Sequence, residues 1–166
     1  MNAQQLHDYI IKPTLEYMGG NYNTPEARLL LLATAAIESD CGYYIKQVYG
    51  PALGIWQMEP LTHDSIWSEC DALYECLGQD VALLIGPAFN SGAREMVTYP
   101  MYACAMARLK YSMDSEPLPK VTGDRKIDEV EFYKYYKRVY NTNLGASTFE
   151  KWQVKCEKHN IFEVKL

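Results

Sequence analysis

The apolar residues of this chain recur mostly at three- and four-residue intervals, the spacing of a helix face, and the alternation typical of strands is short wherever it occurs. No internal repeat or low-complexity segment interrupts this pattern. The pattern predicts a mainly α protein. Helices are expected over residues 3–18, 25–39, 60–67, 71–77, 81–85, 99–113, 129–139 and from 147 onward, with loops over 90–92 and 114–126 and a turn over 141–146.

Local signals set the expected helix boundaries. Pro13 has no backbone N–H and is expected to kink or split the first helix. The run 23–26, Asn-Thr-Pro-Glu, combines a capping side chain, a first-turn proline and an acid, which is typical of a helix start. Gly78 is expected to break the helices around it, and Ser147 with Glu150 is expected to form a capping box.

The helix expected over 25–39 is apolar on nearly every side. Such a helix lies in the middle of a domain, because no face of it favours water. Glu38 therefore places a carboxylic acid on the most buried helix of the chain. Two interpretations stay open at this point: Glu38 is a functional acid, or it is the first solvent-exposed residue at the end of the helix.

Length and charge narrow the class of protein. The 166 residues suit one domain, 1–166, with a single core. A net charge of −5 disfavours nucleic acid as a partner, because phosphate binding needs a basic surface. No apolar run is long enough to cross a bilayer, so no membrane insertion is expected. The N-terminus lacks the pattern of a signal peptide, which predicts synthesis in the cytoplasm without one.

Cysteine and histidine spacing argues against a disulfide framework and against a metal site. The five cysteines are widely spaced, without a CxxC pair, and are expected to be buried reduced thiols: Cys41, Cys70, Cys76, Cys104 and Cys156. The three histidines, His7, His63 and His159, are too far apart in sequence to suggest a ligand cluster. Cys41 with His63 remains a conceivable thiol hydrolase pair, without a third member.

Acid catalysis fits the residues around Glu38 better. Glycosidic cleavage needs a carboxylic acid that stays protonated near neutral pH, and burial achieves this by disfavouring the anion. Trp56 and Met58 offer an apolar environment for such an acid. Sugars bind through aromatic faces and amides, and the chain offers several candidates for that role: Tyr43, Tyr44, Trp56, Gln57 and Asn141.

Two motifs carry a family resemblance. Glu38-Ser39, a loop, and then Gly-Ile-Trp-Gln-Met-x-Pro-x-Thr over 54–62 resemble the signature of soluble lytic transglycosylases, which are related to goose-type lysozymes. The segment 139–146, Val-Tyr-Asn-Thr-Asn-Leu-Gly-Ala, is similar to the AYNAGxGA motif of that family. The first motif is fairly specific and the second is weak alone. Together they cover about 24–150, most of the chain.

The resemblance implies a lysozyme-like single domain without a metal or cofactor. By position, Glu38 is the catalytic general acid and base. Gln57 and Met58 then line the sugar subsites, while Tyr140 and Asn141 face the acid across the cleft. The remaining residues expected to bind substrate are Ser39, from the first motif, and Tyr43, from the loop after it.

The chain departs from the family pattern in two places, and one further segment competes for the second motif. A serine of the family's loop has no counterpart, because Val48 or Tyr49 stands there. Asn143 replaces the first glycine of the second motif. The segment 89–93, Phe-Asn-Ser-Gly-Ala, is a rival match to that motif, but it precedes the helix expected over 99–113, where the family places the motif after it. We therefore assign the motif to Tyr140.

Glu59 bears on the type of reaction. Goose-type lysozymes carry a carboxylate at the matching position. With one acid, the acetamido group of the substrate can attack and give an anhydro product; with a second carboxylate about 6.5–9.5 Å from the first, a water can be activated for hydrolysis. Glu59 is thus a possible second carboxylate. The alternative is that Glu59 is a solvated loop acid before a helix.

The resemblance implies cleavage of the β-1,4 bond between N-acetylmuramic acid and N-acetylglucosamine in peptidoglycan. The partners expected are peptidoglycan glycan strands and, for a virion component, other virion proteins. A compact chain without a wall-binding module suggests a phage lysin or virion-associated lysozyme acting on periplasmic or cell-wall peptidoglycan. The alternative is a non-catalytic phage structural protein that retains the fold, which the acidic net charge suits slightly better because the bacterial wall is also anionic.

Overall fold

The computed structural model describes residues 1–85, 92–142 and 145–166, with only the backbone described at 75 and 76. Within these residues the chain is helical and contains no β-strand, so the expectation of a mainly α protein is confirmed. In chain order the helical elements are α1 (Ala3–Leu6), η1 (His7–Ile11), α2 (Lys12–Met18), η2 (Gly20–Tyr22), α3 (Pro25–Ser39), α4 (Pro60–Glu69), η3 (Leu73–Leu77), α5 (Gly78–Leu83), α6 (Glu95–Thr98), α7 (Pro100–Ser112), α8 (Arg125–Tyr136), η4 (Lys137–Asn141), α9 (Phe149–Lys158) and η5 (Ile161–Glu163).

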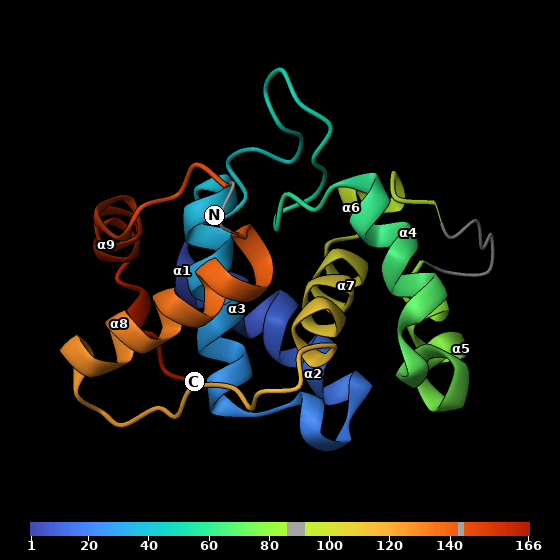
Figure 1. The fold of residues 1–166 in the computed structure, drawn as a ribbon, viewed down its shortest axis with the longest axis horizontal. Coiled ribbons are helices and arrows are strands. Elements are labelled where there is room, and N and C mark those ends of the chain that lie inside the picture. The colour runs from blue at the N-terminus through green and yellow to red at the C-terminus, as the bar shows by residue number, and fades with distance from the viewer. Residues whose placement is uncertain (86–91, 143–144) are drawn as a thin grey trace.

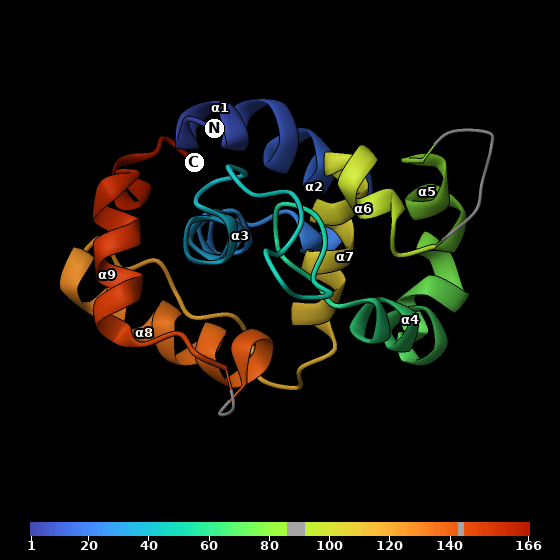
Figure 2. The same cartoon turned by 90° about the horizontal axis from the view of Figure 1, so that it is seen from above.

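Helix α3 lies at the centre of the molecule and packs against α7, α8, α9, η1 and η5 (Figures 1 and 2). Its start is the one expected: Thr24 is the N-cap, its hydroxyl accepts a hydrogen bond from the Ala27 N–H at 3.2 Å, and Pro25 follows. Side chains on every side of α3 are buried, which confirms the central position inferred from its composition. The helix ends at Asp40, in the left-handed conformation.

The first expected helix is one helical column divided by a wide π turn, η1. The backbone N–H of Lys12 donates to the carbonyl of His7, five residues earlier, as in a π-helix. Pro13 follows directly and cannot donate to a carbonyl of the preceding turn, so the column resumes as α2 from that point. Pro13 therefore does not end the helical column; it lies where the π turn gives way to an α-helix, whereas a kink or a split was expected.

Gly78 does not break a helix, contrary to expectation. It lies in the right-handed helical region with φ −58° and begins α5 directly after η3. A Cβ at this position would lie 2.3 Å from the carbonyl oxygen of Leu73, because a π turn brings that carbonyl close to the fifth residue after it. Glycine is needed at position 78 because the Leu73 carbonyl comes so close to it. The sequence pattern alone cannot distinguish a glycine with this role from a glycine that ends a helix.

Other helix boundaries also differ from expectation. Helix α8 begins four residues early, because Asp124 acts as its N-cap and accepts hydrogen bonds from the N–H groups of Lys126 and Ile127. Helix α9 has Thr148 as its N-cap, so Ser147 and Glu150 do not form the expected capping box. The short helix α6 was not expected, and most of the expected loop 90–92 lies outside the described residues.

The chain between α3 and α4 forms an extended loop that projects away from the helices (Figure 1). Its base is a tight backbone turn in which Leu53 and Met58 exchange two hydrogen bonds, at 2.9 and 3.0 Å. The indole N–H of Trp56 anchors this turn by donating to the carbonyl of Leu31 on α3 at 2.9 Å. This bond fixes the turn against the middle of the central helix.

Cys41, Cys70, Cys104 and Cys156 are free and buried, as expected of core thiols, and the side chain of Cys76 lies outside the described residues. Within the part of the chain that the structure describes, none of the helices combines the length and apolarity needed to cross a membrane.

Candidate functional site

A cavity of about 530 Å³ opens where the C-terminal end of α3 faces η4, and the turn after Leu53 and the first residues of α4 form its opposite wall. Ionisable and amide side chains are frequent in its lining. The lining residues are Ile37, Glu38, Gln47, Ala52, Gln57, Met58, Glu59, Thr62, Lys110, Tyr136, Tyr140, Asn141, Thr142, Gly145, Ala146, Ser147 and Lys151.

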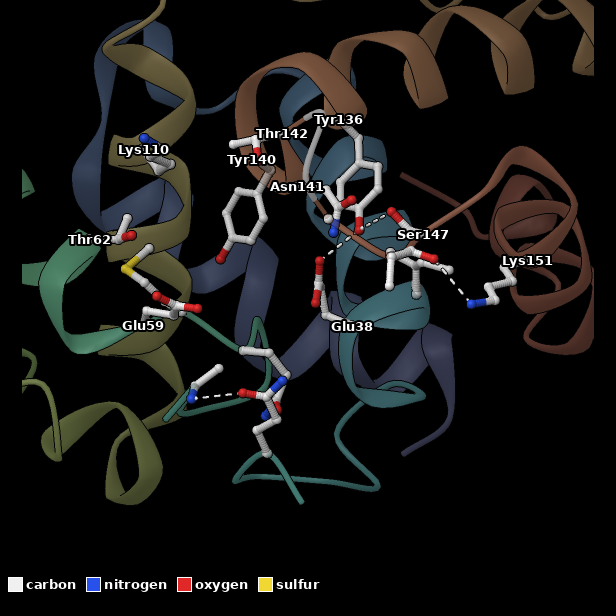
Figure 3. A pocket seen from close by; sticks show the side chains of 17 residues that line it. Glu38, Glu59, Thr62, Lys110, Tyr136, Tyr140, Asn141, Thr142, Ser147 and Lys151 are labelled. Carbon is white, nitrogen blue, oxygen red and sulfur yellow. Dashed lines mark hydrogen bonds between the residues drawn. The ribbon is translucent and has the colours of Figure 1, made fainter. Parts of the chain in front are cut away.

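Glu38 extends from the last turn of α3 into this cavity (Figure 3). Its Oε1 accepts a hydrogen bond from the hydroxyl of Tyr136 at 2.6 Å, and the side chain of Asn141 also hydrogen-bonds to it. Burial raises the pKa of Glu38 above its ordinary value, while the two hydrogen bonds and the charge of Lys137 act in the opposite direction. The negative end of the α3 dipole is a further reason for the carboxyl to hold its proton.

Tyr136 was not expected in the site. Its hydroxyl lies 2.6 Å from Glu38 and 3.2 Å from the Oγ of Ser147. Burial raises the pKa of Tyr136 strongly, and the adjacent carboxylate raises it further, so the phenol keeps its proton. Since a phenol has one proton and donates it to Glu38, the Ser147 hydroxyl is left to donate to the phenol oxygen, which completes a chain from Ser147 through Tyr136 to Glu38.

Tyr140 lies in the cavity wall as expected, but its hydroxyl does not bond to the acid. It donates instead to the carbonyl of Trp56 at 2.9 Å, and thereby ties η4 to the turn that carries Gln57. Asn141, the next residue, does reach Glu38. Of the two motif residues expected to face the acid, Asn141 does so directly, and Tyr140 holds the two walls together.

Gln57 and Met58 both line the cavity, on the wall opposite η4. Gln57 has a positive φ of 45°, and its amide donates to the carbonyl of Gly54 at 2.8 Å. Met58 is buried and belongs to the cavity lining as well. The structure therefore brings this part of the first motif to the acid, as expected.

Glu59 also lines the cavity, with an exposed side chain on the side away from Ser147 and Lys151 (Figure 3). It occupies the N-cap position of α4, yet its carboxylate makes no capping hydrogen bond. No ion pair with Glu59 occurs among the described residues. This carboxylate is therefore available to a water or ligand in the cavity.

Two expected substrate-binding residues do not line the cavity. Ser39 is fully buried, where its hydroxyl donates to the Ala35 carbonyl and accepts from the Gly42 N–H. Its role is to close the end of α3. Tyr43 is 73% exposed and packs edge-on against Tyr44, with ring centroids 4.8 Å apart, on the projecting loop.

Val48 and Tyr49, one of which stands at the position of the family's loop serine, are both highly exposed and do not line the cavity. Tyr136 and Ser147 supply hydroxyl groups at the acid from the other side of the cavity. The sequence contained a clue to Tyr136, because it precedes Tyr140 by four residues and so lies on the same helix face. In the structure the two rings are stacked, with centroids 6.3 Å apart. The rival segment 89–93 lies largely outside the described residues.

The competing thiol site lacks an activated thiol. Cys41 is fully buried, and burial raises the pKa of its thiol to about 11, which opposes formation of the nucleophilic thiolate. His63 is engaged elsewhere, 2.6 Å from the hydroxyl of Tyr102 and 2.8 Å from Asp64. Among the described residues no group of three or more His, Cys, Asp or Glu side chains could hold a metal ion.

Comparison of the chain with protein-family models, with curated proteins and with solved structures found no match.

Proposed function

We propose that this chain is a peptidoglycan-degrading glycosidase, a single lysozyme-like catalytic domain in which Glu38 acts as general acid and then as base. The observation that carries the proposal is the placement of Glu38: a carboxyl with a raised pKa, in the wall of an open cavity, next to a protonated Tyr136. The resemblance of the 38–62 and 139–146 segments to lytic transglycosylases and goose-type lysozymes supplies the substrate class.

The chemistry follows from the position of that proton. Because burial raises the pKa of Glu38, its carboxyl group is suited to donate a proton to the oxygen of the scissile glycosidic bond. The resulting carboxylate is then stabilised by the donors that already contact it, Tyr136 and Asn141. It can accept a proton in the second step, from the muramyl 6-hydroxyl or from water.

Glu59 decides between the two products in this proposal. If it activates a water, the enzyme is a hydrolytic muramidase and releases reducing ends. If it does not, the acetamido group attacks C1 as the leaving sugar departs, and the muramyl 6-hydroxyl, losing its proton to Glu38, then displaces the acetamido oxygen and gives 1,6-anhydro ends, as in a lytic transglycosylase. Mass spectrometry of the released muropeptides separates the two outcomes, which differ by one water, and Glu59→Gln should change the product pattern only in the hydrolytic case.

The second candidate is a non-catalytic phage structural protein that keeps a lysozyme-like fold. The net charge of −5 favours it slightly, since the bacterial wall is anionic. The joint presence of Glu38, its donors and an accessible Glu59 in one cavity argues against it, because a decayed site has no reason to keep these groups together.

The decisive experiment is clearance of purified peptidoglycan, followed by turbidity, with Glu38→Gln. Removing the transferable proton should lower the rate by about 100-fold or more, with an unchanged thermal unfolding midpoint. Glu69→Gln, an exposed acid on α4 outside the cavity, is the matched control and should retain the wild-type rate. Undiminished clearance by Glu38→Gln would reject the assignment, and a wild-type protein that leaves peptidoglycan intact would favour the structural role.

A further inference from the structure

Lys137 is the first residue of the π turn η4, and its ammonium group makes two hydrogen bonds. Its Nζ donates to the side-chain oxygen of Asn141 at 2.8 Å and to the backbone carbonyl of Gly145 at 2.7 Å. Asn141 and Gly145 both line the cavity. One cation thus holds together two points of the wall that faces Glu38, in a type of turn that is frequent at functional sites.

The contact with Lys137 fixes which way the Asn141 amide points. An ammonium group has donors and no acceptor, so the atom it contacts must be the amide oxygen. The amide nitrogen is then left on the other side, toward Glu38, as Figure 3 shows. An amide nitrogen can only donate, so Asn141 acts on Glu38 as a donor that favours the carboxylate.

Gly145 provides a second, independent restraint on the Asn141 side chain. A Cβ on residue 145 would lie 2.1 Å from the Asn141 side-chain oxygen and 2.3 Å from the Asn141 backbone oxygen. No side chain larger than a hydrogen fits there. The backbone of the turn therefore packs directly on the amide that Lys137 holds, and both contacts restrict the same side chain.

We propose that Lys137 is a positioning residue for the acid: it locks Asn141 in the orientation that donates to Glu38, and its charge helps to stabilise the carboxylate that forms after proton transfer. The inference rests on the proposed function of Glu38. The sequence motif contains Asn141 but not Lys137, so the residue that orients the amide lies outside the segment that suggested the site.

Several other groups face Glu38 and must be separated from this effect. Tyr136 donates a hydrogen bond to it, and Tyr111 and Tyr140 are buried phenols whose raised pKa values keep them neutral. The charged side chains around the rest of the cavity are Glu59, Lys110 and Lys151. Lys151 donates to the Ala146 carbonyl at 3.1 Å, in the turn that precedes α9.

The test compares Lys137→Met, which removes both the charge and the donors, with Lys137→Gln, which keeps an amide donor for Asn141 but no charge. Lys134→Met is the matched control, since Lys134 is exposed on the preceding turn and pairs with Glu131. The pKa of Glu38 is measured by carboxyl ¹³C NMR titration, its signal identified by its loss in Glu38→Gln. The Asn141 side-chain NH₂ signal reports the orientation of the amide.

We expect Lys137→Met to raise the pKa of Glu38 by roughly 0.5 to 1, to move the Asn141 NH₂ signal and to shift the alkaline limb of the rate profile upward. Lys137→Gln should return the Asn141 NH₂ signal to its wild-type position, while the pKa of Glu38 stays above the wild-type value because the charge is missing. If the Met variant does not fold, the Gln variant still tests whether the charge of Lys137 acts on Glu38. An unchanged Glu38 pKa and Asn141 signal in a folded Lys137 variant would overturn the proposal. Both NMR readouts are independent of turnover, so an inactive wild-type protein would refute the proposed function alone.

Discussion

At Glu38, opposing effects set the proton affinity of one carboxyl. Burial raises its pKa, and the donors Tyr136 and Asn141 lower it. The balance matters because a general acid must be protonated before the reaction and tolerate a negative charge after it. The sequence singled out Glu38 because it stands at the end of an apolar helix. Its hydrogen-bond donor at 2.6 Å, Tyr136, is far away in the sequence and could be identified only from the folded structure.

Tyr136→Phe tests this balance. Removing a hydrogen bond from the carboxylate form should raise the pKa of Glu38 further, by roughly 0.5 to 1, since a hydrogen bond of this kind contributes about 1 kcal/mol. The alkaline limb of kcat/KM against pH should move upward by the same amount, and kcat should fall about tenfold because the developing carboxylate loses a donor. Tyr133→Phe, on the same helix, should leave the profile unchanged. A coincident profile for Tyr136→Phe would show that Tyr136 does not act on Glu38.

Among the elements, the turn between α3 and α4 depends on Gly54. Its φ is +73°, and an added Cβ would lie 2.7 Å from the carbonyl oxygen of Met96 and 3.2 Å from the Ala103 side chain. Glycine is required both for its backbone angle and for close approach to α6 and α7. The sequence motif marked this position, but only the packing of α6 and α7 against the turn explains it.

Gly54→Ala should therefore destabilise the protein by roughly 2–4 kcal/mol, from backbone strain and the clash together. Gly123→Ala is the matched control, because Gly123 has φ +82° but open space around it, and should cost only roughly 1–2 kcal/mol of strain. Urea unfolding of both variants measures the difference. Equal losses in the two variants would mean that close packing at Gly54 contributes nothing.

At the scale of the whole molecule, Asp40 joins the central helix to the C-terminal one. Its carboxylate, at the end of α3, bonds to Lys155 and Lys158 of α9 and to His159 directly after it. Despite partial burial, these hydrogen bonds lower the pKa of Asp40 well below its ordinary value. Asp40 follows Glu38 by two residues, so this cluster also fixes the end of the helix that presents the acid.

Asp40→Asn should lower the free energy of unfolding by roughly 1–2 kcal/mol at pH 7. A carboxyl whose pKa is depressed in the folded state stabilises it above the unfolded-state pKa, about 3.9, and loses that contribution as the pH falls toward the folded-state value. The difference between wild type and variant should therefore hold from pH 5 to 7 and shrink below about pH 4. Urea unfolding across this range measures it, and a difference that persists undiminished to pH 2 would exclude the carboxylate as the cause.

The sequence by itself determined the helical class, the central position and start of α3, the acid at its end and the motif that returns Gln57 and Met58 to that acid. These features rest on local patterns: apolar periodicity, a Thr-Pro cap and residue identity at fixed spacing. Tertiary structure alone decided that Ser39 turns inward, that Tyr140 bonds to a backbone carbonyl, and that Tyr136, Ser147 and Lys137 surround the acid. The contacts of Tyr136 with Glu38 and of Tyr140 with Trp56 join residues far apart in the sequence, which only the packing of α8 and η4 brings together. Helical periodicity carries no information about which distant side chains will meet.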